Sequence, residues 1–158
     1  VRDARASVYS LIRKYNESLD MGNAIRYLMT WNQYYLKVND LCKKLGPSKC
    51  IIVKYENLIL YPEDTIKYVT NFLNLTWTNN FLNHSQFIGN KIVVSRSEWS
   101  TDQIKKPIYK NSLNEWSKKM IYNTNDLNLR ANMLTTFGYD LKKNSYEYLK
   151  PYNKRSKT

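Results

Sequence analysis

The residues best suited to hold an anion lie near the start of the chain. Arg2, Ser10 and Lys14 fall in a stretch that predicts the last residues of a buried strand, a tight turn and the first turns of a helix. Residues three and four apart share one face of a helix, so Ser10 lies beside both Arg13 and Lys14. Arg2 would leave the carboxyl end of the strand, where ligands bind in open α/β sheets, close to helix N–H groups that favour anions. This spacing fits a phosphate site, although arginine and serine in the first turns of a surface helix are usually solvated.

A second group of polar residues occupies a long segment without helical or strand periodicity, residues 90–110. A long loop without secondary structure in a compact domain is usually functional or disordered. Its backbone N–H groups and hydroxyls can donate to phosphate oxygens, and its lysines add charge. The polar and basic residues of this loop are Lys91, Arg96, Ser97, Ser100, Thr101, Asp102, Gln103, Lys105 and Lys106.

The elements that must position these residues predict an α/β fold. A long amphipathic helix is expected over residues 23–45, and Gly46 with Pro47 ends it. The run 50–55 is short, β-branched and apolar, which is typical of a strand covered on both faces. A strand, a helix and a second strand in succession favour a parallel sheet. The apolar stripe of the helix is Leu28, Trp31, Tyr35, Val38, Leu41 and Leu45.

The rest of the chain is predicted to be mostly helical. Pro62 begins a helix, residues 81–88 form a short one that closes near Gly89, and two further short helices follow. Residues 1–140 therefore suit one domain, and the basic segment 141–158 is expected to be a poorly ordered tail. The helix that begins at Pro62 is expected to bury Ile66, Val69, Phe72 and Leu73, and the short helix after the loop is expected to bury Leu113, Trp116 and Met120. The last helix is expected over residues 126–137, with Gly138 as its cap.

Composition restricts the class of protein and of partner. The 158 residues suit one domain with a real core, and the formal charge of +12 implies an acidic partner: nucleic acid, an anionic cofactor, an acidic peptide or a membrane surface. No run approaches the roughly 18 apolar residues of a membrane span. The chain has no starting Met and opens at what reads as the end of a strand, so we expect a fragment of a longer protein.

Two cysteines and three glycosylation sequons favour a secretory lumen. The sequons begin at Asn16, Asn74 and Asn83. Cys42 near the end of the long helix and Cys50 at the start of the expected strand are joined by a tight connection that can bring them together, and two independent buried thiols are the alternative.

Four segments, in the same order, resemble the tyrosylprotein sulfotransferases, which transfer a sulfuryl group from PAPS (3′-phosphoadenosine 5′-phosphosulfate) to protein tyrosines. They are residues 1–10 with the pattern Val-Arg-Asp-x-Arg-Ala-Ser-Val-x-Ser, the cysteine pair, residues 53–58, and the loop from Ser100 to Pro107. The loop is the most specific segment, because Ser-Thr-Asp-Gln followed by Lys-Pro has no obvious packing role. The resemblance implies a P-loop-NTPase-like sulfotransferase fold, here a partial parallel sheet with surrounding helices.

The same resemblance implies roles for individual residues. Arg2 and Ser10 would hold the 3′-phosphate of PAPS, with Arg13 or Lys14 as a third ligand; both remain open, although the fork of Arg13 is chemically better suited. Tyr55 would contact the nucleotide; on sequence alone, a role of its side chain in packing the core is an equal alternative. The loop residues Ser100, Thr101, Asp102, Gln103 and Lys106 would cover the cofactor, Ser100 would also stabilise the transition state, and Cys42 would pair with Cys50.

Two departures and one absence qualify the resemblance. Glu115 stands where the family has a lysine, so that phosphate contact is lost or supplied by a neighbour such as Lys118, and the loop over residues 16–22 is shorter than in the family. The 5′-phosphosulfate loop and the catalytic glutamate of the family belong to a half that precedes Val1. We therefore expect that this fragment alone does not catalyse.

The leading hypothesis is the carboxyl-terminal half of a protein-tyrosine sulfotransferase in the Golgi lumen. Its partners would be acidic tyrosine-containing proteins, drawn by the basic surface, and possibly a second copy of the chain. A membrane anchor is expected only in the missing amino-terminal part, and no metal site is predicted. The alternatives are an inactive sulfotransferase-like remnant that acts as a binding module, and a basic nucleic-acid-binding domain, for which no zinc spacing or helix-turn-helix pattern is found.

Overall fold

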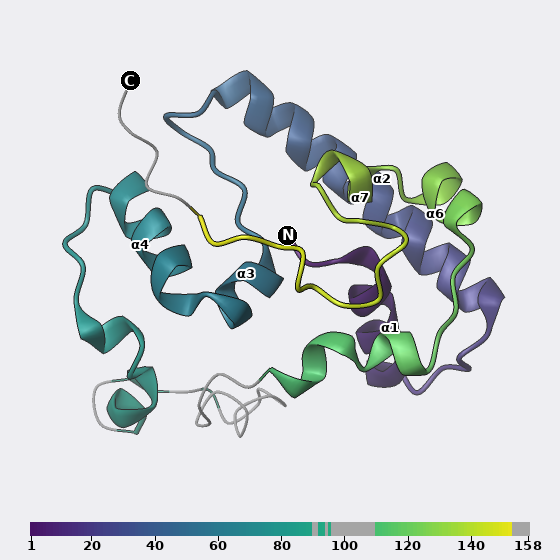
Figure 1. The fold of residues 1–158 in the computed structure, drawn as a ribbon, viewed down its shortest axis with the longest axis horizontal. Coiled ribbons are helices and arrows are strands. Elements are labelled where there is room, and N and C mark those ends of the chain that lie inside the picture. Colours follow the sequence, from purple (N-terminus) through teal and green to yellow (C-terminus); the bar gives the residue numbers. More distant parts are fainter. Residues whose placement is uncertain (90–91, 94, 96–109, 153–158) are drawn as a thin grey trace. The chain divides into compact units, whose positions relative to one another are not determined.

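The computed structural model describes residues 1–89, 92–93, 95 and 110–152. The chain forms two compact units (Figure 1). Unit 1 comprises Val1–Glu56 and Asn111–Lys150, and unit 2 comprises Asn57–Lys110 and Pro151–Thr158. Within the described part of the chain, no helix has the length and apolar character needed to cross a membrane.

The first helix, α1 (Ala4–Lys14), confirms that a helix follows the opening residues. Its predicted position is wrong: Ser10, Arg13 and Lys14 were expected in the first turns, but they lie in the second half of the helix, because α1 starts already at Ala4. Asp3 is its N-cap, and the Asp3 side chain accepts a hydrogen bond from the backbone N–H of Arg5 at 2.8 Å. This is the usual role of aspartate before a helix, because the first N–H groups have no partner within the helix. The apolar residues Val8 and Ile12 of α1 are fully buried.

The second helix, α2 (Met21–Leu45), confirms the long amphipathic helix and begins slightly earlier than predicted, because Asp20 caps it by accepting from Asn23 N–H. It ends at Gly46, whose φ of 78° lies in the left-handed region that favours glycine. Helix α1 packs against α2 within unit 1 (Figure 1). Leu28 and Trp31 of the predicted stripe are buried, as expected.

The prediction that the apolar stripe of α2 is buried along its whole length is wrong at the carboxyl-terminal end. Leu41 and Leu45 are exposed, whereas the polar Asn39 is buried. The elements that pack on α2 are α1, α6 (Thr124–Arg130) and α7 (Met133–Thr136), all of unit 1. Phe137, which follows α7, contacts the rings of Trp31 and Tyr35 on α2. Periodicity identifies the apolar side of a helix, but it does not show how far along the helix its partners extend.

The disulfide between Cys42 and Cys50 confirms the pairing that the resemblance implied. The turn between them is held by the Gly46 N–H, which donates to the Cys42 carbonyl, and by the Cys50 N–H, which donates to the Gly46 carbonyl at 3.0 Å. The bridge therefore joins the last turn of α2 to the segment that leads to α3 (Tyr55–Leu60).

Replacing both Cys42 and Cys50 with serine is expected to lower the free energy of unfolding by about 2.5 kcal/mol, because the open chain gains entropy mainly in the unfolded state. Urea denaturation of the double variant beside the oxidised protein measures the difference. The reduced wild-type protein should match the variant, and a difference below about 0.5 kcal/mol would contradict the prediction.

No strand is present among the described residues, so the predicted strand over residues 50–55 is wrong in its extent and the sheet is not confirmed. Tyr55 instead begins α3. Two hydrogen bonds nevertheless follow the parallel pattern: the Val1 amino group donates to the Val53 carbonyl at 2.6 Å, and the Tyr55 N–H donates to the Val1 carbonyl at 2.7 Å. One residue that bonds to positions two apart on its neighbour is the unit of a parallel ladder.

The second half of unit 1 is built from short turns and helices. Residues 111–118 form two 3-10 helices, η3 (Asn111–Asn114) and η4 (Trp116–Lys118), and Leu113, Trp116 and Met120 are buried, as predicted. The helix predicted over residues 126–137 is divided into α6 and α7 at Ala131 and Asn132. Asn32 of α2 stabilises this division, because its Oδ1 accepts from Met133 N–H at 2.9 Å. Gly138 follows with a φ of 72°.

Unit 2 contains α4 (Pro62–Phe72) and two 3-10 helices, η1 (Asn79–Phe81) and η2 (His84–Phe87). Pro62 stands at the first helical position, and Gly89 follows η2 with a φ of 85°, both as predicted. Of the expected inner residues of α4, Ile66, Val69 and Phe72 are half-buried, but Leu73 is exposed.

The residues after Asp140 differ from the expectation of a poorly ordered tail over 141–158. Tyr146 and Leu149 are buried, and the segment from Tyr139 passes beside the amino end of α1 (Figure 1). The sequence suggested a tail because lysine, asparagine and tyrosine dominate here. Buried tyrosines with hydrogen-bond partners make such a composition compatible with a core. Residues 153–158 lie outside the described residues.

Candidate functional site

Arg2 and Tyr55, two of the predicted nucleotide ligands, lie together in the structure. The guanidinium of Arg2 stands 4.9 Å from the centre of the Tyr55 ring. Both residues are half-buried, so each presents one side to solvent. The parallel hydrogen bonds of Val1 with Val53 and Tyr55 bring the two segments side by side. This pairing unites a cation and an aromatic face, a combination suited to a phosphate beside a base.

The other predicted phosphate ligands lie further along α1. Ser10 is half-buried, whereas Arg13 and Lys14 are exposed on the last turn of the helix. The amino end of α1 differs from the prediction of an anion held by free helix N–H groups, because the carboxylate of Asp3 already accepts from the Arg5 N–H. Anion binding at this site would therefore depend on the side chains of Arg2, Ser10, Arg13 and Lys14.

A cavity of about 470 Å³ adjoins the carboxyl-terminal half of α1. Three cationic side chains and one carboxylate line it, together with the ring of Tyr9 and the side chain of Leu19. The volume is that of a small-molecule site, and the excess of positive charge favours an anion. The charged lining residues are Arg13, Glu115, Lys118 and Lys119.

Glu115 forms an ion pair with Arg13, with 3.7 Å between Arg13 Nη1 and Glu115 Oε2. The Arg13 and Glu115 side chains are 62% and 43% exposed, so the pair contributes only about 0–1 kcal/mol. An incoming anion can therefore draw Arg13 away from Glu115 at small cost. Lys118 lines the same cavity, which agrees with the expectation that a neighbour supplies the positive charge that Glu115 does not.

A buried hydrogen-bonded network lies directly behind Arg2 and Tyr55. The backbone N–H of Asp3 donates to Glu56 Oε1 at 2.9 Å, and the Tyr139 hydroxyl donates to Glu56 Oε2 at 2.6 Å. Glu56 is 0% exposed. Asp3 follows Arg2 and Glu56 follows Tyr55, so the network fixes the backbone of both candidate ligands.

Arg5 forms the second half of this network. It donates from Nε and Nη2 to the two carboxylate oxygens of Asp3, at 3.1 and 2.8 Å, and it is 1% exposed. Its remaining N–H groups donate to the carbonyls of Asp140, Leu141 and Lys143, which ties the segment after Tyr139 to α1. The guanidinium also stacks over the ring of Trp116 at 4.4 Å. A bidentate pair with all donors used is the arrangement that a buried charge requires.

Burial raises the pKa of Glu56, and the hydrogen bonds from Tyr139 and Asp3 offset only part of that rise. Burial also raises the pKa of Tyr139, whose hydroxyl therefore stays protonated and can donate to Glu56. Because both oxygens of Glu56 accept hydrogen bonds inside the core, this carboxylate serves the structure and is not placed to act as a base.

Replacing Glu56 with glutamine is expected to flatten the pH dependence of stability. A carboxyl group whose pKa is raised by folding stabilises the folded state fully below its ordinary pKa of about 4.3, and this contribution is lost as the pH rises through the raised value. Urea unfolding at a series of pH values should therefore show the wild-type protein losing stability relative to Glu56→Gln as the pH rises through this interval.

Tyr139→Phe offers a matched comparison for the same carboxylate. Removing the hydroxyl takes away a hydrogen bond that lowers the pKa of Glu56, so the interval over which stability is lost should move to higher pH. A stability difference between wild type and Glu56→Gln that stays constant with pH would contradict this account.

The residues that were predicted to cover the cofactor are not among those that the structure describes. Ser100, Thr101, Asp102, Gln103 and Lys106 lie outside the described residues. The three sequon asparagines, Asn16, Asn74 and Asn83, are all exposed, and the first two have φ values of 53° and 54°.

Several residues of this site were not predicted from the sequence. Asp3 and Arg5 stood within the recognised segment but without an assigned role, and Glu56 stood directly after Tyr55. Their position next to candidate ligands was the only signal available. Tyr139 and Tyr146 gave no signal, because they stand near or within the segment that was interpreted as a tail. Trp116 Nε1 donates to the Tyr146 hydroxyl at 2.9 Å.

The amino-acid sequence of this chain is similar to those of known proteins. Residues 1–79 match the family model described as "Sulfotransferase family". The chain is 34% identical over 154 residues to protein-tyrosine sulfotransferase A of Caenorhabditis elegans, and 32% identical over 156 residues to the protein-tyrosine sulfotransferase of Drosophila melanogaster. It is 35% identical over 156 residues to protein-tyrosine sulfotransferase 2 of Gallus gallus. Each match covers 96% of this chain but only 40%, 31% and 42% of the respective relative.

Proposed function

Because this chain belongs to the sulfotransferase family, we propose that it forms the carboxyl-terminal part of a protein-tyrosine sulfotransferase and supplies the 3′-phosphate site for PAPS. Family membership implies the sulfotransferase fold. The observation that carries the proposal is the pairing of Arg2 with Tyr55 over the buried network of Asp3, Glu56 and Tyr139. The paired segments before α1 and α3 would then be neighbouring strands of a parallel sheet in the complete protein.

The residues present fit a phosphorylated nucleotide. Arg2 is a cation whose position is fixed by its neighbours, and its guanidinium fork can bind two phosphate oxygens. Ser10 on α1 adds a hydroxyl donor, and Arg13 or Lys14 adds a second charge. The cavity lined by Arg13, Lys118 and Lys119 provides a positive field beside them, and its Glu115 pair is weak enough to rearrange.

PAPS supplies an activated sulfuryl group, and the residues of this chain would position it. Arg2 would hold the 3′-phosphate in place, and Tyr55 would orient the nucleotide through its ring. Ser100, Thr101, Asp102, Gln103 and Lys106 would cover the cofactor, and the hydroxyl of Ser100 would donate to the oxygens that gain charge in the transition state. No carboxylate of this chain is assigned as the base that accepts the tyrosine proton.

The setting of the reaction is also a proposal. Acceptors would be tyrosines flanked by acidic residues, because a chain with a charge of +12 attracts acidic segments over a range set by salt. The parent protein would act in the Golgi lumen as a homodimer, held by a membrane anchor outside this chain. The disulfide and the exposed sequons suit an oxidising secretory compartment.

A transfer assay with the full-length protein tests this function. Labelled PAPS and a peptide with one tyrosine among glutamates are expected to give labelled peptide, and the same peptide with phenylalanine is expected to give none. The 158-residue chain by itself is expected to bind PAP (3′,5′-diphosphoadenosine), the product, without transferring label. Full-length protein that binds PAP but never labels the tyrosine peptide would favour an inactive remnant, and steep salt-dependent binding to generic DNA without binding PAP would favour a nucleic-acid module.

A further inference from the structure

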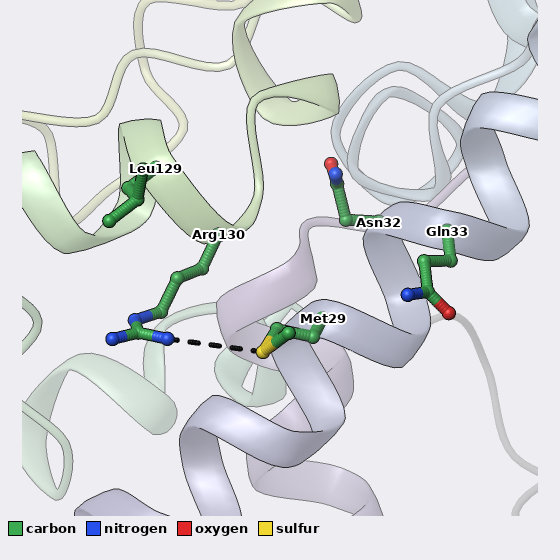
Figure 2. Close-up of a pocket in the computed structure, with 5 residues that line it drawn as sticks. All are labelled: Met29, Asn32, Gln33, Leu129 and Arg130. Carbon is green, nitrogen blue, oxygen red and sulfur yellow. Dashed lines mark hydrogen bonds between the residues drawn. The ribbon is translucent and has the colours of Figure 1, made fainter.

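A second, smaller cavity of about 220 Å³ lies between α2 and α6 in unit 1. It shares no residue with the proposed nucleotide site. Figure 2 shows Arg130 reaching from α6 toward Met29 on α2, with Asn32 and Gln33 further along α2. Leu129 completes the lining.

Arg130 differs from three other arginines of unit 1, each of which forms an ion pair with a carboxylate. Arg5 pairs with Asp3, Arg13 with Glu115 and Arg26 with Glu17. Among the described residues, Arg130 donates from Nη1 only to the sulfur of Met29 at 3.9 Å, and thioether sulfur is a weak acceptor. Its Nε is buried without any hydrogen-bond partner. Because its partner in the chain is a weak acceptor, the Arg130 guanidinium can bind a carboxylate that enters the cavity.

The surroundings of Arg130 restrict the kind of acceptor. The guanidinium fork matches the two oxygens of a carboxylate. Asn32 uses its Oδ1 to accept from Met133 N–H, and its amide N–H₂ can donate to a ligand. The rim is apolar and open to solvent, because Met29 is exposed and Leu129 is 77% exposed. A free carboxylate would leave these two side chains in water, whereas a peptide residue next to the acid would cover them.

We propose that this cavity binds the carboxylate of an acidic side chain in a peptide whose neighbouring residues are apolar. The high positive charge of the chain favours the approach of such a peptide. None of the cavity residues is assigned to the nucleotide, so peptide binding here can be measured without PAPS.

Methionine methyl NMR of the intact protein tests the site, since Met29 reports on it directly and Met120 and Met133 are buried elsewhere. The probe is N-acetyl-Leu-Glu-Leu-amide, and its Gln counterpart has the same shape without the charge. The Glu peptide is expected to shift the Met29 signal to saturation, and the Gln peptide is expected to bind about tenfold more weakly. Arg130→Gln should weaken the Glu peptide about tenfold and abolish the difference between the two peptides.

Matched variants separate this site from general charge attraction. Arg26→Gln removes an exposed arginine of α2 that already pairs with Glu17, and it should leave the preference for Glu unchanged. Leu129→Ala should weaken both peptides equally and keep the preference, and it supplies a test even if Arg130→Gln disturbs folding. Equal binding of the two peptides, a preference that survives in Arg130→Gln, or displacement of the Glu peptide by PAP would each overturn the proposal.

Discussion

Replacing Arg5 with methionine is expected to lower the free energy of unfolding by about 3–5 kcal/mol. The change leaves the carboxylate of Asp3 buried with only a backbone donor and removes the donors to the carbonyls of Asp140, Leu141 and Lys143. Breaking a buried ion pair by removing one partner costs far more than the pair itself contributes, because an uncompensated charge remains in the core. Methionine keeps much of the side-chain volume, so the effect reports on charge and hydrogen bonding.

Urea denaturation followed by tryptophan fluorescence measures this effect, since Arg5 stacks on Trp116. Arg26→Met is the matched control: its guanidinium pairs with Glu17 at the surface, and its loss should change stability far less than the loss of Arg5. A loss below 1 kcal/mol for Arg5→Met would show that the buried network does not hold the segment after Tyr139 against α1.

Replacing Arg2 with alanine is expected to weaken the binding of PAP about 10- to 100-fold. A hydrogen bond to a charged group contributes roughly 1.5–3 kcal/mol, and this range corresponds to about the expected loss of the contact between Arg2 and the 3′-phosphate. Isothermal titration of the full-length protein with PAP measures the change. Stability should change little, because Arg2 is half-buried and contacts only the ring of Tyr55 in the described structure.

Adenosine 5′-monophosphate, which lacks the 3′-phosphate, is the control ligand for this variant. Its affinity should be the same for wild type and Arg2→Ala, because the interaction removed is with the missing group. Arg13→Ala and Lys14→Ala, measured with both nucleotides, show which of the two provides the third ligand. Undiminished affinity of Arg2→Ala for PAP would count against the proposed 3′-phosphate site while leaving the family assignment intact.

Features that depend on local chemistry could be predicted from the amino-acid sequence. Most of α2, its stop at Gly46, Pro62 at the first position of α4 and the burial of Leu113 and Trp116 all follow from breakers and periodicity within a few residues. The pairing of Cys42 with Cys50 followed from resemblance and from the short connection between them. The candidates Arg2 and Tyr55 were identified the same way, and the structure brings them together.

The hydrogen bonds and ion pairs that support those candidates could not be predicted in this way. The bonds from Asp3 and Tyr139 to Glu56, the contacts of Arg5 with the segment after Tyr139, and the pairing of Arg13 with Glu115 join residues far apart in sequence. Polar side chains have no periodicity that reveals whether they face water or a distant partner. Their burial becomes favourable only when the fold supplies a hydrogen-bond partner. Local sequence patterns do not show which distant residue that partner will be.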